Sequence, residues 1–211
     1  MNNDKLQNKK VAILVESQYI PEEIAVYREK FNQYGMVVDF MSRLWGNAKM
    51  TFISTVSEAG KTPETLDVSI DFDKVKLEDY AAVIMSANYT SVRLRHFEPP
   101  DKKPITADMV KTAPAVDFYA RAMKSQRIIK GALCHGLWII TPNPELLRNR
   151  KVICNNVVLA DIINAGGVFS DDPSGVVVDK DLVTGRTYHE TALFVDKIVE
   201  QILKVENGES L

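Results

Sequence analysis

The stretch from Lys130 to Ile140 holds the residues best suited to covalent chemistry. It contains Cys134 followed directly by His135, with an apolar run before the cysteine and another that opens at Gly136. The first run predicts a strand and the second a helix. A side chain at a tight strand-to-helix turn lies near the amides of the helix start, which favour a thiolate and can hold an oxyanion. Cys134 is therefore the candidate nucleophile, with His135 placed to accept or donate its proton.

A cysteine after an apolar strand is also commonly a small buried hydrophobe without chemistry. We expect this of Cys154, which ends another predicted strand. For Cys134, the adjacent His135 and the glycines at positions 131 and 136 favour the reactive interpretation. Glycine tolerates the close approach and unusual dihedrals that such a turn requires.

Further apolar runs predict the sheet that positions this turn. Val11 to Val15, Met36 to Met41 and Ala81 to Met85 have the pattern of strands buried on both faces, and predicted helices alternate with them. We therefore predict a flavodoxin-like three-layer α/β/α sandwich with a mostly parallel central sheet. In such sheets, reactive groups lie past the carboxyl ends of the strands. Glu16 to Glu23, Ser86 to Asn88 and Cys134 all fall at that edge.

Two segments depart from the strand–helix alternation. Lys49 to Ile70 has short β-type runs and could form a small antiparallel excursion. Asn88 to Thr106 is a long polar segment, which suits a functional lid, an interface or merely an irregular surface loop. Near the other end of the chain, Val176 to Thr184 predicts a hairpin.

Composition limits the classes of protein to consider. The 211 residues are 45% hydrophobic and 26% charged, with a formal net charge of -2, which argues against a nucleic-acid surface. We expect one domain over 1–211, with flexible ends at 1–10 and 205–211. The two cysteines lack zinc spacing, so no metal site is expected. The start of the chain has no secretory leader and nowhere is there a long apolar run, so we expect a reducing, cytoplasmic location and no membrane span.

The segment Ala132-Leu133-Cys134-His135-Gly136 resembles the cysteine motif of the ThiJ/PfpI (DJ-1) family, within the class I glutamine-amidotransferase-like superfamily. Asp161 to Gly166 and the run from Val176 to Arg186 resemble the family's C-terminal block in order and spacing. The resemblance extends from Val11 to Leu203 and is weakest from Leu44 to Asp71.

The resemblance implies a glutamate from the first helix that hydrogen-bonds the cysteine sulfur. Counting back from Gly35, which ends that helix, gives Glu23, with Glu22 as the alternative. Both are also favourable charges for the first turn of any helix. As a protonated acid, Glu23 would donate to the thiolate and keep the thiol pKa low.

One departure concerns the pocket around the sulfur. The family commonly has Gly-Gly after the third strand, where this chain has Ser86-Ala87. We expect the amides of Ala87 and His135 to form the oxyanion pocket, with Asn88 and Gly136 beside them, and strain at Ala87 if it adopts positive φ. Arg186 matches an arginine the family often keeps, which can serve the site, a salt bridge or an interface.

The resemblance implies a cofactor-independent cysteine hydrolase, of the protease/amidase or deglycase/glyoxalase kind. Its substrate would be a small carbonyl, an amide or a short peptide. The alternative is a redox-sensing stress protein or holdase chaperone that uses reversible oxidation of the same cysteine. Family relatives are typically dimers or larger assemblies, so a homodimer or larger homo-oligomer is expected.

Overall fold

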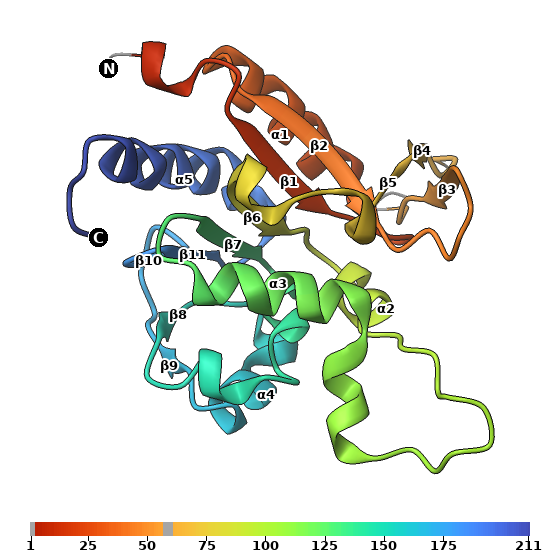
Figure 1. Ribbon diagram of the computed structural model, residues 1–211. Coiled ribbons are helices and arrows are strands. Elements are labelled where there is room, and N and C mark those ends of the chain that lie inside the picture. Colours follow the sequence, from red (N-terminus) through yellow and green to blue (C-terminus); the bar gives the residue numbers. More distant parts are fainter. Residues whose placement is uncertain (1–2, 57–60) are drawn as a thin grey trace.

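The computed structural model describes residues 3–56 and 61–211 and places seven strands in one twisted sheet (Figure 1). These strands are β1 (Lys10–Leu14), β2 (Val37–Ser42), β5 (Ile70–Asp71), β6 (Tyr80–Met85), β7 (Ile129–Leu133), β10 (Val176–Asp179) and β11 (Leu182–Gly185). Their order is β10-β11-β7-β6-β1-β2-β5, and every neighbouring pair is parallel except the β10–β11 hairpin.

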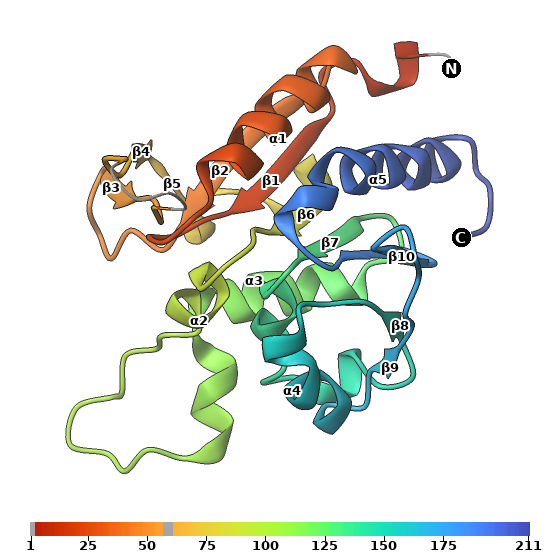
Figure 2. The same ribbon diagram turned by 180° about the vertical axis from the view of Figure 1, so that it is seen from behind.

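Helices cover both faces of the sheet. They are α1 (Pro21–Gln33), α2 (Thr90–Leu94), α3 (Pro114–Lys124), α4 (Leu159–Asn164) and α5 (Thr191–Glu206). Helices α1 and α5 lie side by side on one face, while α3 lies on the other, with α2 and α4 near it (Figures 1 and 2). The predicted flavodoxin-like sandwich with a mostly parallel sheet is confirmed.

The apolar runs form central strands because both faces of the sheet are buried. In β1, Val11 and Ile13 pack into the core beneath α1 and α5, whereas Ala12 and Leu14 pack into the core beneath α3. Gly131 in β7 is required by helix packing, since a Cβ there would lie 2.7 Å from the Phe194 ring of α5. The strand that leads to Cys134 is thus clamped tightly against its helix.

The middle of β7 carries a buried charge. Lys130 is fully buried, and its Nζ donates to the Ser125 carbonyl at 2.7 Å and pairs with Asp181. Arg150 also pairs with Asp181, at 2.7 Å. These bonds compensate for the desolvation of the ammonium group, which on its own would be costly.

Two small sheets lie outside the main one. Strands β3 (Met50–Ile53) and β4 (Thr65–Val68) pair antiparallel, which confirms the excursion predicted over Lys49 to Ile70 for the residues that the structure describes; 57–60 lie outside them. Strands β8 (Lys151–Val152) and β9 (Val168–Phe169) pair separately. In the ends predicted to be flexible, Leu6 is buried and α5 continues to Glu206, while residues 1–2 lie outside the described chain.

The segment Asn88 to Thr106 is not the uniform loop that was expected. Helix α2 forms at Thr90–Leu94, because its buried face packs against the turn after Cys134, and a 3₁₀ helix follows at Ala107–Thr112. Between them the chain extends away from the sheet (Figure 1).

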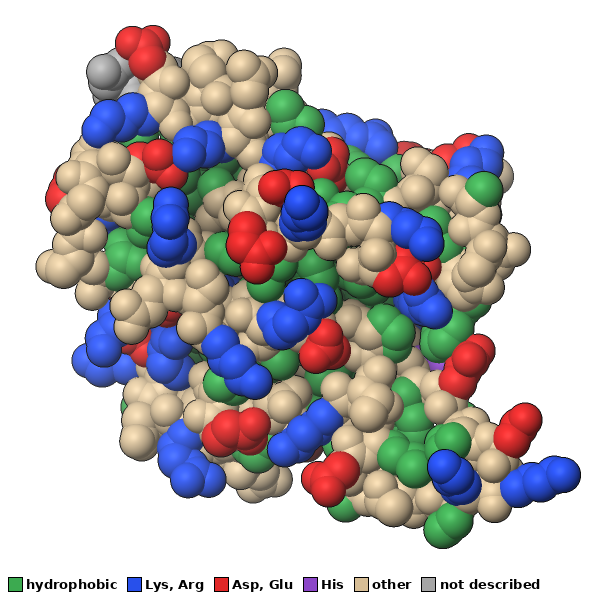
Figure 3. Space-filling view, viewed as in Figure 1, with side chains coloured by type: hydrophobic (Ala, Val, Ile, Leu, Met, Phe, Trp, Pro, Cys, Tyr) green, Lys and Arg blue, Asp and Glu red, His purple; other side chains and the backbone are tan. Residues whose placement is uncertain are grey.

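Surface charge is mixed, with Lys and Arg interspersed among Asp and Glu on the face in Figure 3. Within residues 3–56 and 61–211, no helix is both long and apolar enough to cross a membrane.

Candidate active site

Cys134 lies directly after β7, in a left-handed backbone conformation with φ of 61°. Such a φ is uncommon for a residue with a side chain and costs about 1–3 kcal/mol. The turn is held by a hydrogen bond from the Cys134 amide to the Gly185 carbonyl, at 2.8 Å, and by one from the Asn155 amide to the Cys134 carbonyl, at 3.1 Å. The predicted helix follows as a 3₁₀ helix, η5 (Gly136–Ile139).

Gly136 allows this short helix to pack against the end of β6. A Cβ at position 136 would lie 2.8 Å from the carbonyl oxygen of Met85. The role of Gly136 is therefore close backbone approach, and it lets η5 begin immediately past the cysteine.

The thiol and the imidazole expected to act together are in contact. The Sγ of Cys134 lies 2.9 Å from Nδ1 of His135, and the two residues are only 6% and 8% exposed. The ring of Tyr89 lies 5.1 Å from that of His135, and the Trp138 ring lies 5.3 Å from it, measured between centroids. These rings restrict solvent around the Cys134–His135 pair.

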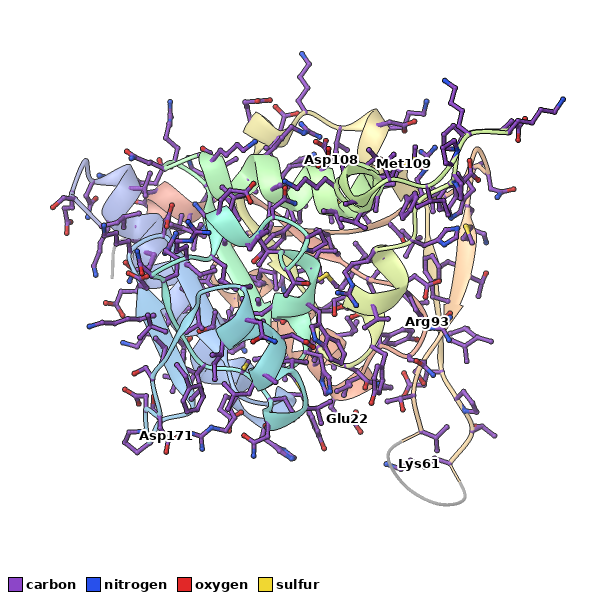
Figure 4. All side chains as sticks on the ribbon, turned by 90° about the horizontal axis from the view of Figure 1, so that it is seen from below. Glu22, Lys61, Arg93, Asp108, Met109 and Asp171 are labelled. Carbon is purple, nitrogen blue, oxygen red and sulfur yellow. The ribbon has the colours of Figure 1, made fainter. Side chains whose placement is uncertain are left out.

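The structure distinguishes the two candidate glutamates of α1. Glu23 is fully buried, and both of its carboxyl oxygens accept the Ala87 amide, at 2.9 and 3.0 Å. Glu22 is exposed, with its side chain directed outward at the edge of the molecule (Figure 4). Glu23 also interacts electrostatically with Cys134, and it raises the pKa of that thiol.

Burial raises the pKa of Glu23 to about 8. The Tyr27 hydroxyl, one helical turn further on, and the Ala87 amide partly offset this shift. The Tyr27 hydroxyl does so without a well-aligned hydrogen bond among the described residues. At neutral pH Glu23 is therefore mostly an uncharged acid that can donate a proton.

The expected low thiol pKa is not what the structure produces. Burial raises the pKa of Cys134 to about 11, although the amides of Asn88 and His135 and the side chain of Asn155 donate toward the sulfur. A charged Glu23 would raise that pKa further. Desolvation outweighs the favourable dipoles of the turn, so the resting state is a thiol.

The expected oxyanion donors also need correction. The Ala87 amide is already taken by Glu23, and the positive φ falls on the next residue, Asn88, at 64°. Asparagine tolerates this conformation better than alanine does. The amides of Asn88 and His135 instead donate toward the sulfur.

The contacts of Arg186 and Cys154 indicate structural roles. The Arg186 side chain pairs with Asp171 and donates to the Asp172 carbonyl at 3.2 Å, so its guanidinium holds the loop before β10. Cys154 is 1% exposed, and burial raises its pKa to about 12, as expected for a packing residue. Among the described residues, no cluster of three His, Cys, Asp or Glu side chains could hold a metal ion.

Sequence reasoning missed Asn155 and Ser91. The Ser91 hydroxyl donates to the His135 carbonyl at 3.0 Å and so helps to fix the backbone of His135. Asn155 follows a predicted strand, and that position at the carboxyl edge of the sheet was the available signal.

The chain is similar in sequence to several known proteins. The model of the DJ-1/PfpI family matches residues 104–201, which include the cysteine turn. "Protein/nucleic acid deglycase 2" of Escherichia coli is 26% identical over 190 residues, covering 89% of this chain and 94% of that protein. An uncharacterised protein of Staphylococcus haemolyticus is 24% identical over 194 residues, covering 92% and 98%.

Solved structures show the same fold. A two-domain protein of Anabaena variabilis with DJ-1/ThiJ/PfpI-like and ferritin-like domains superposes with a TM-score of 0.72 and 21% identity, covering 97% of this chain and 50% of that one. Schizosaccharomyces pombe DJ-1 gives a TM-score of 0.64 and 17% identity, covering 94% and 95%. The chain is thus similar to the DJ-1/PfpI family over residues 104–201 and has the fold of its solved structures.

Proposed function

We propose that this protein is a cofactor-independent cysteine hydrolase of the deglycase or glyoxalase kind, acting on small carbonyl compounds and related amides or short peptides. The observation that carries the proposal is the contact of 2.9 Å between the Cys134 sulfur and Nδ1 of His135. The similarity to an E. coli protein described as a deglycase supports carbonyl chemistry.

The raised thiol pKa determines how this pair must work. A pKa of about 11 leaves about one thiol in ten thousand ionised at neutral pH, too few for a preformed thiolate to carry the reaction. Burial lowers the pKa of His135, so its imidazole is neutral. With the imidazole proton on Nε2, Nδ1 accepts the thiol proton while the sulfur attacks.

In this step a bond forms between sulfur and the carbonyl carbon, and the carbonyl π bond breaks. The developing oxyanion is stabilised by the Asn88 and His135 amides and takes the thiol proton back through His135, which gives a hemithioacetal. For an α-oxoaldehyde, a hydrogen shift from the aldehyde carbon to the neighbouring carbonyl gives a thioester. Water then hydrolyses the thioester to a 2-hydroxy acid, so no external oxidant is needed.

Glu23 suits this chemistry because it is uncharged at neutral pH. A carboxylate beneath the sulfur would repel the negative charge that develops there, whereas a protonated acid can donate to it. The same feature supports the second candidate, reversible oxidation. In that reaction one peroxide transfers an oxygen to the sulfur and leaves as water, which gives a sulfenic acid. A second peroxide does the same to give the sulfinic acid, and the acid of Glu23 donates to either product.

The test follows conversion of methylglyoxal to lactate by NMR. Wild type and Cys154→Ala should both show turnover, and Cys134→Ala should show none. If Cys134→Ala retains the wild-type rate, the proposed function is wrong. If no variant shows turnover but peroxide converts Cys134 specifically to a sulfinate, as seen by peptide mass spectrometry, the redox role replaces it.

A further inference from the structure

A pocket lies at the carboxyl ends of β1 and β2. It has a volume of 880 Å³ and is bounded by residues after β1 and β2, by α2 and by the chain that follows η5. Neither Cys134, His135 nor Glu23 lines it. A volume of this order suits a small molecule.

Unsatisfied polar atoms concentrate in this pocket. Four buried side-chain nitrogen or oxygen atoms of the described chain lack a hydrogen-bond partner, and three belong to pocket residues: Glu16 Oε2, Ser42 Oγ and Arg43 Nε. Ser42 is completely buried. Buried polar atoms in folded proteins are nearly always hydrogen-bonded, to protein groups, ordered water or a ligand. Three atoms without a protein partner around one cavity therefore mark it as a polar site that can take a bound molecule.

The pocket has charged side chains of both signs, and most of them form ion pairs. Arg43 pairs with Asp71 at 3.0 Å. The Nε of Arg93 lies 3.6 Å from the Glu16 carboxyl, a long contact that leaves the acid able to accept another donor. Arg93, which is labelled in Figure 4, also lines the pocket.

Arg95 is the exception. Among the described residues it has no carboxylate within salt-bridge distance; its Nη1 donates to the Thr141 hydroxyl at 3.1 Å, and its guanidinium lies 5.9 Å from the Trp138 ring. One available arginine suits a carboxylate, and the Glu16 carboxyl, which has only the long ion-pair contact to Arg93, suits an ammonium group. A dianion such as phosphate matches this near-balance less well.

An aromatic wall completes the pocket. Trp45 adopts φ of 52° and is followed by Gly46 at 83°, and a left-handed conformation is costly for so bulky a residue. The Trp45 ring packs edge-on against His96, with centroids 5.5 Å apart, and under the Arg43 guanidinium at 5.2 Å. Met50 and Val92 add apolar side chains to the lining of the pocket.

We propose that this pocket binds a small zwitterion, an α-amino acid or short peptide with an apolar or aromatic side chain. Arg95 and the Nε of Arg43 would hold the carboxylate, Glu16 and the Ser42 hydroxyl would hold the ammonium group, and Trp45 would pack on the side chain. None of the residues that would hold the zwitterion belongs to the Cys134–His135 pair.

The test uses three compounds that differ by one group: L-phenylalanine, 3-phenylpropionate without the amine, and 2-phenylethylamine without the carboxylate. Two-dimensional NMR follows the indole N–H signals of the chain's two tryptophans. Phenylalanine should shift the Trp45 signal saturably, with a Kd below about 1 mM, and each single-group analogue should bind about tenfold or more weakly. Equal binding of all three, or no saturable shift with any, refutes the proposal.

Variants locate the binding. Ser42→Ala removes a hydroxyl that has no partner in the described chain, so it should leave the fold intact yet weaken phenylalanine binding several-fold. Arg95→Gln should weaken it about tenfold or more. Arg121→Gln, on the exposed face of α3, is the matched control and should bind as wild type does, as should Cys134→Ala. Undiminished binding to both pocket variants would overturn the assignment.

Discussion

Replacing Glu23 with glutamine should change how stability depends on pH. The carboxyl has a pKa of about 8 in the folded chain, against an ordinary value of 4.5. Between these values the folded chain keeps a proton that the unfolded chain has lost, so the free energy of unfolding falls as the pH rises. At about 1.36 kcal/mol per pH unit, wild type should lose roughly 3–4 kcal/mol through this group between about pH 5 and about pH 8.

In Glu23→Gln, the free energy of unfolding should not fall with pH through this position, because glutamine does not titrate. A glutamine oxygen can still accept the Ala87 amide, so near pH 5 the variant should be about as stable as wild type. Near pH 8 it should be more stable by about 3–4 kcal/mol, because it has no buried proton to release.

Urea unfolding monitored by circular dichroism across this pH range measures the difference directly. Because all other titrating groups are common to both proteins, subtracting the two curves isolates Glu23. Glu22→Gln is the matched control, one residue away on the exposed side of α1. The difference in free energy of unfolding between this variant and wild type should change by less than about 0.5 kcal/mol across the pH range. Parallel curves for wild type and Glu23→Gln would refute the buried neutral acid.

Three further changes test the turn and the core. His135→Gln should lower kcat/KM for methylglyoxal by about 10²–10⁴-fold, because the proton acceptor is lost, and an unchanged rate would exclude it as the base. Gly136→Ala places a methyl group 2.8 Å from the Met85 carbonyl, so we expect about 1–3 kcal/mol of destabilisation in urea; a loss near zero would show that η5 can shift freely. Lys130→Met leaves Asp181 with one cationic partner in place of two and should lower the free energy of unfolding by about 3 kcal/mol. Equal or greater stability of the variant in chemical denaturation would contradict this prediction.

The sheet could be predicted because its strands are buried on both faces. A continuous apolar run as short as Val11 to Val15 buries all of its side chains when it forms a central strand covered on both faces. The turn at Cys134 could be predicted from the strand before it and from the glycines around it. Helix α2 was missed because it is only one turn long and polar in sequence, and it forms where tertiary packing buries it.

The choice between Glu22 and Glu23 shows where sequence reasoning stops. Successive residues on a helix point about 100° apart, so a one-residue error in alignment exchanges a buried acid for an exposed one. The thiol pKa was harder still, because desolvation sums over neighbours from many parts of the chain. The turn's amides favour a thiolate, and only the folded surroundings show that burial outweighs them.

The central claim is that Cys134 is reactive through its contact with His135, although it is buried. The most direct measurement is the rate of iodoacetamide alkylation of each cysteine in the native protein, resolved by peptide mass spectrometry. Cys134 should react at least about tenfold faster than Cys154, and His135→Gln should abolish the difference. If both cysteines are protected equally until urea unfolds the chain, Cys134 is a packing residue and the proposed chemistry is wrong.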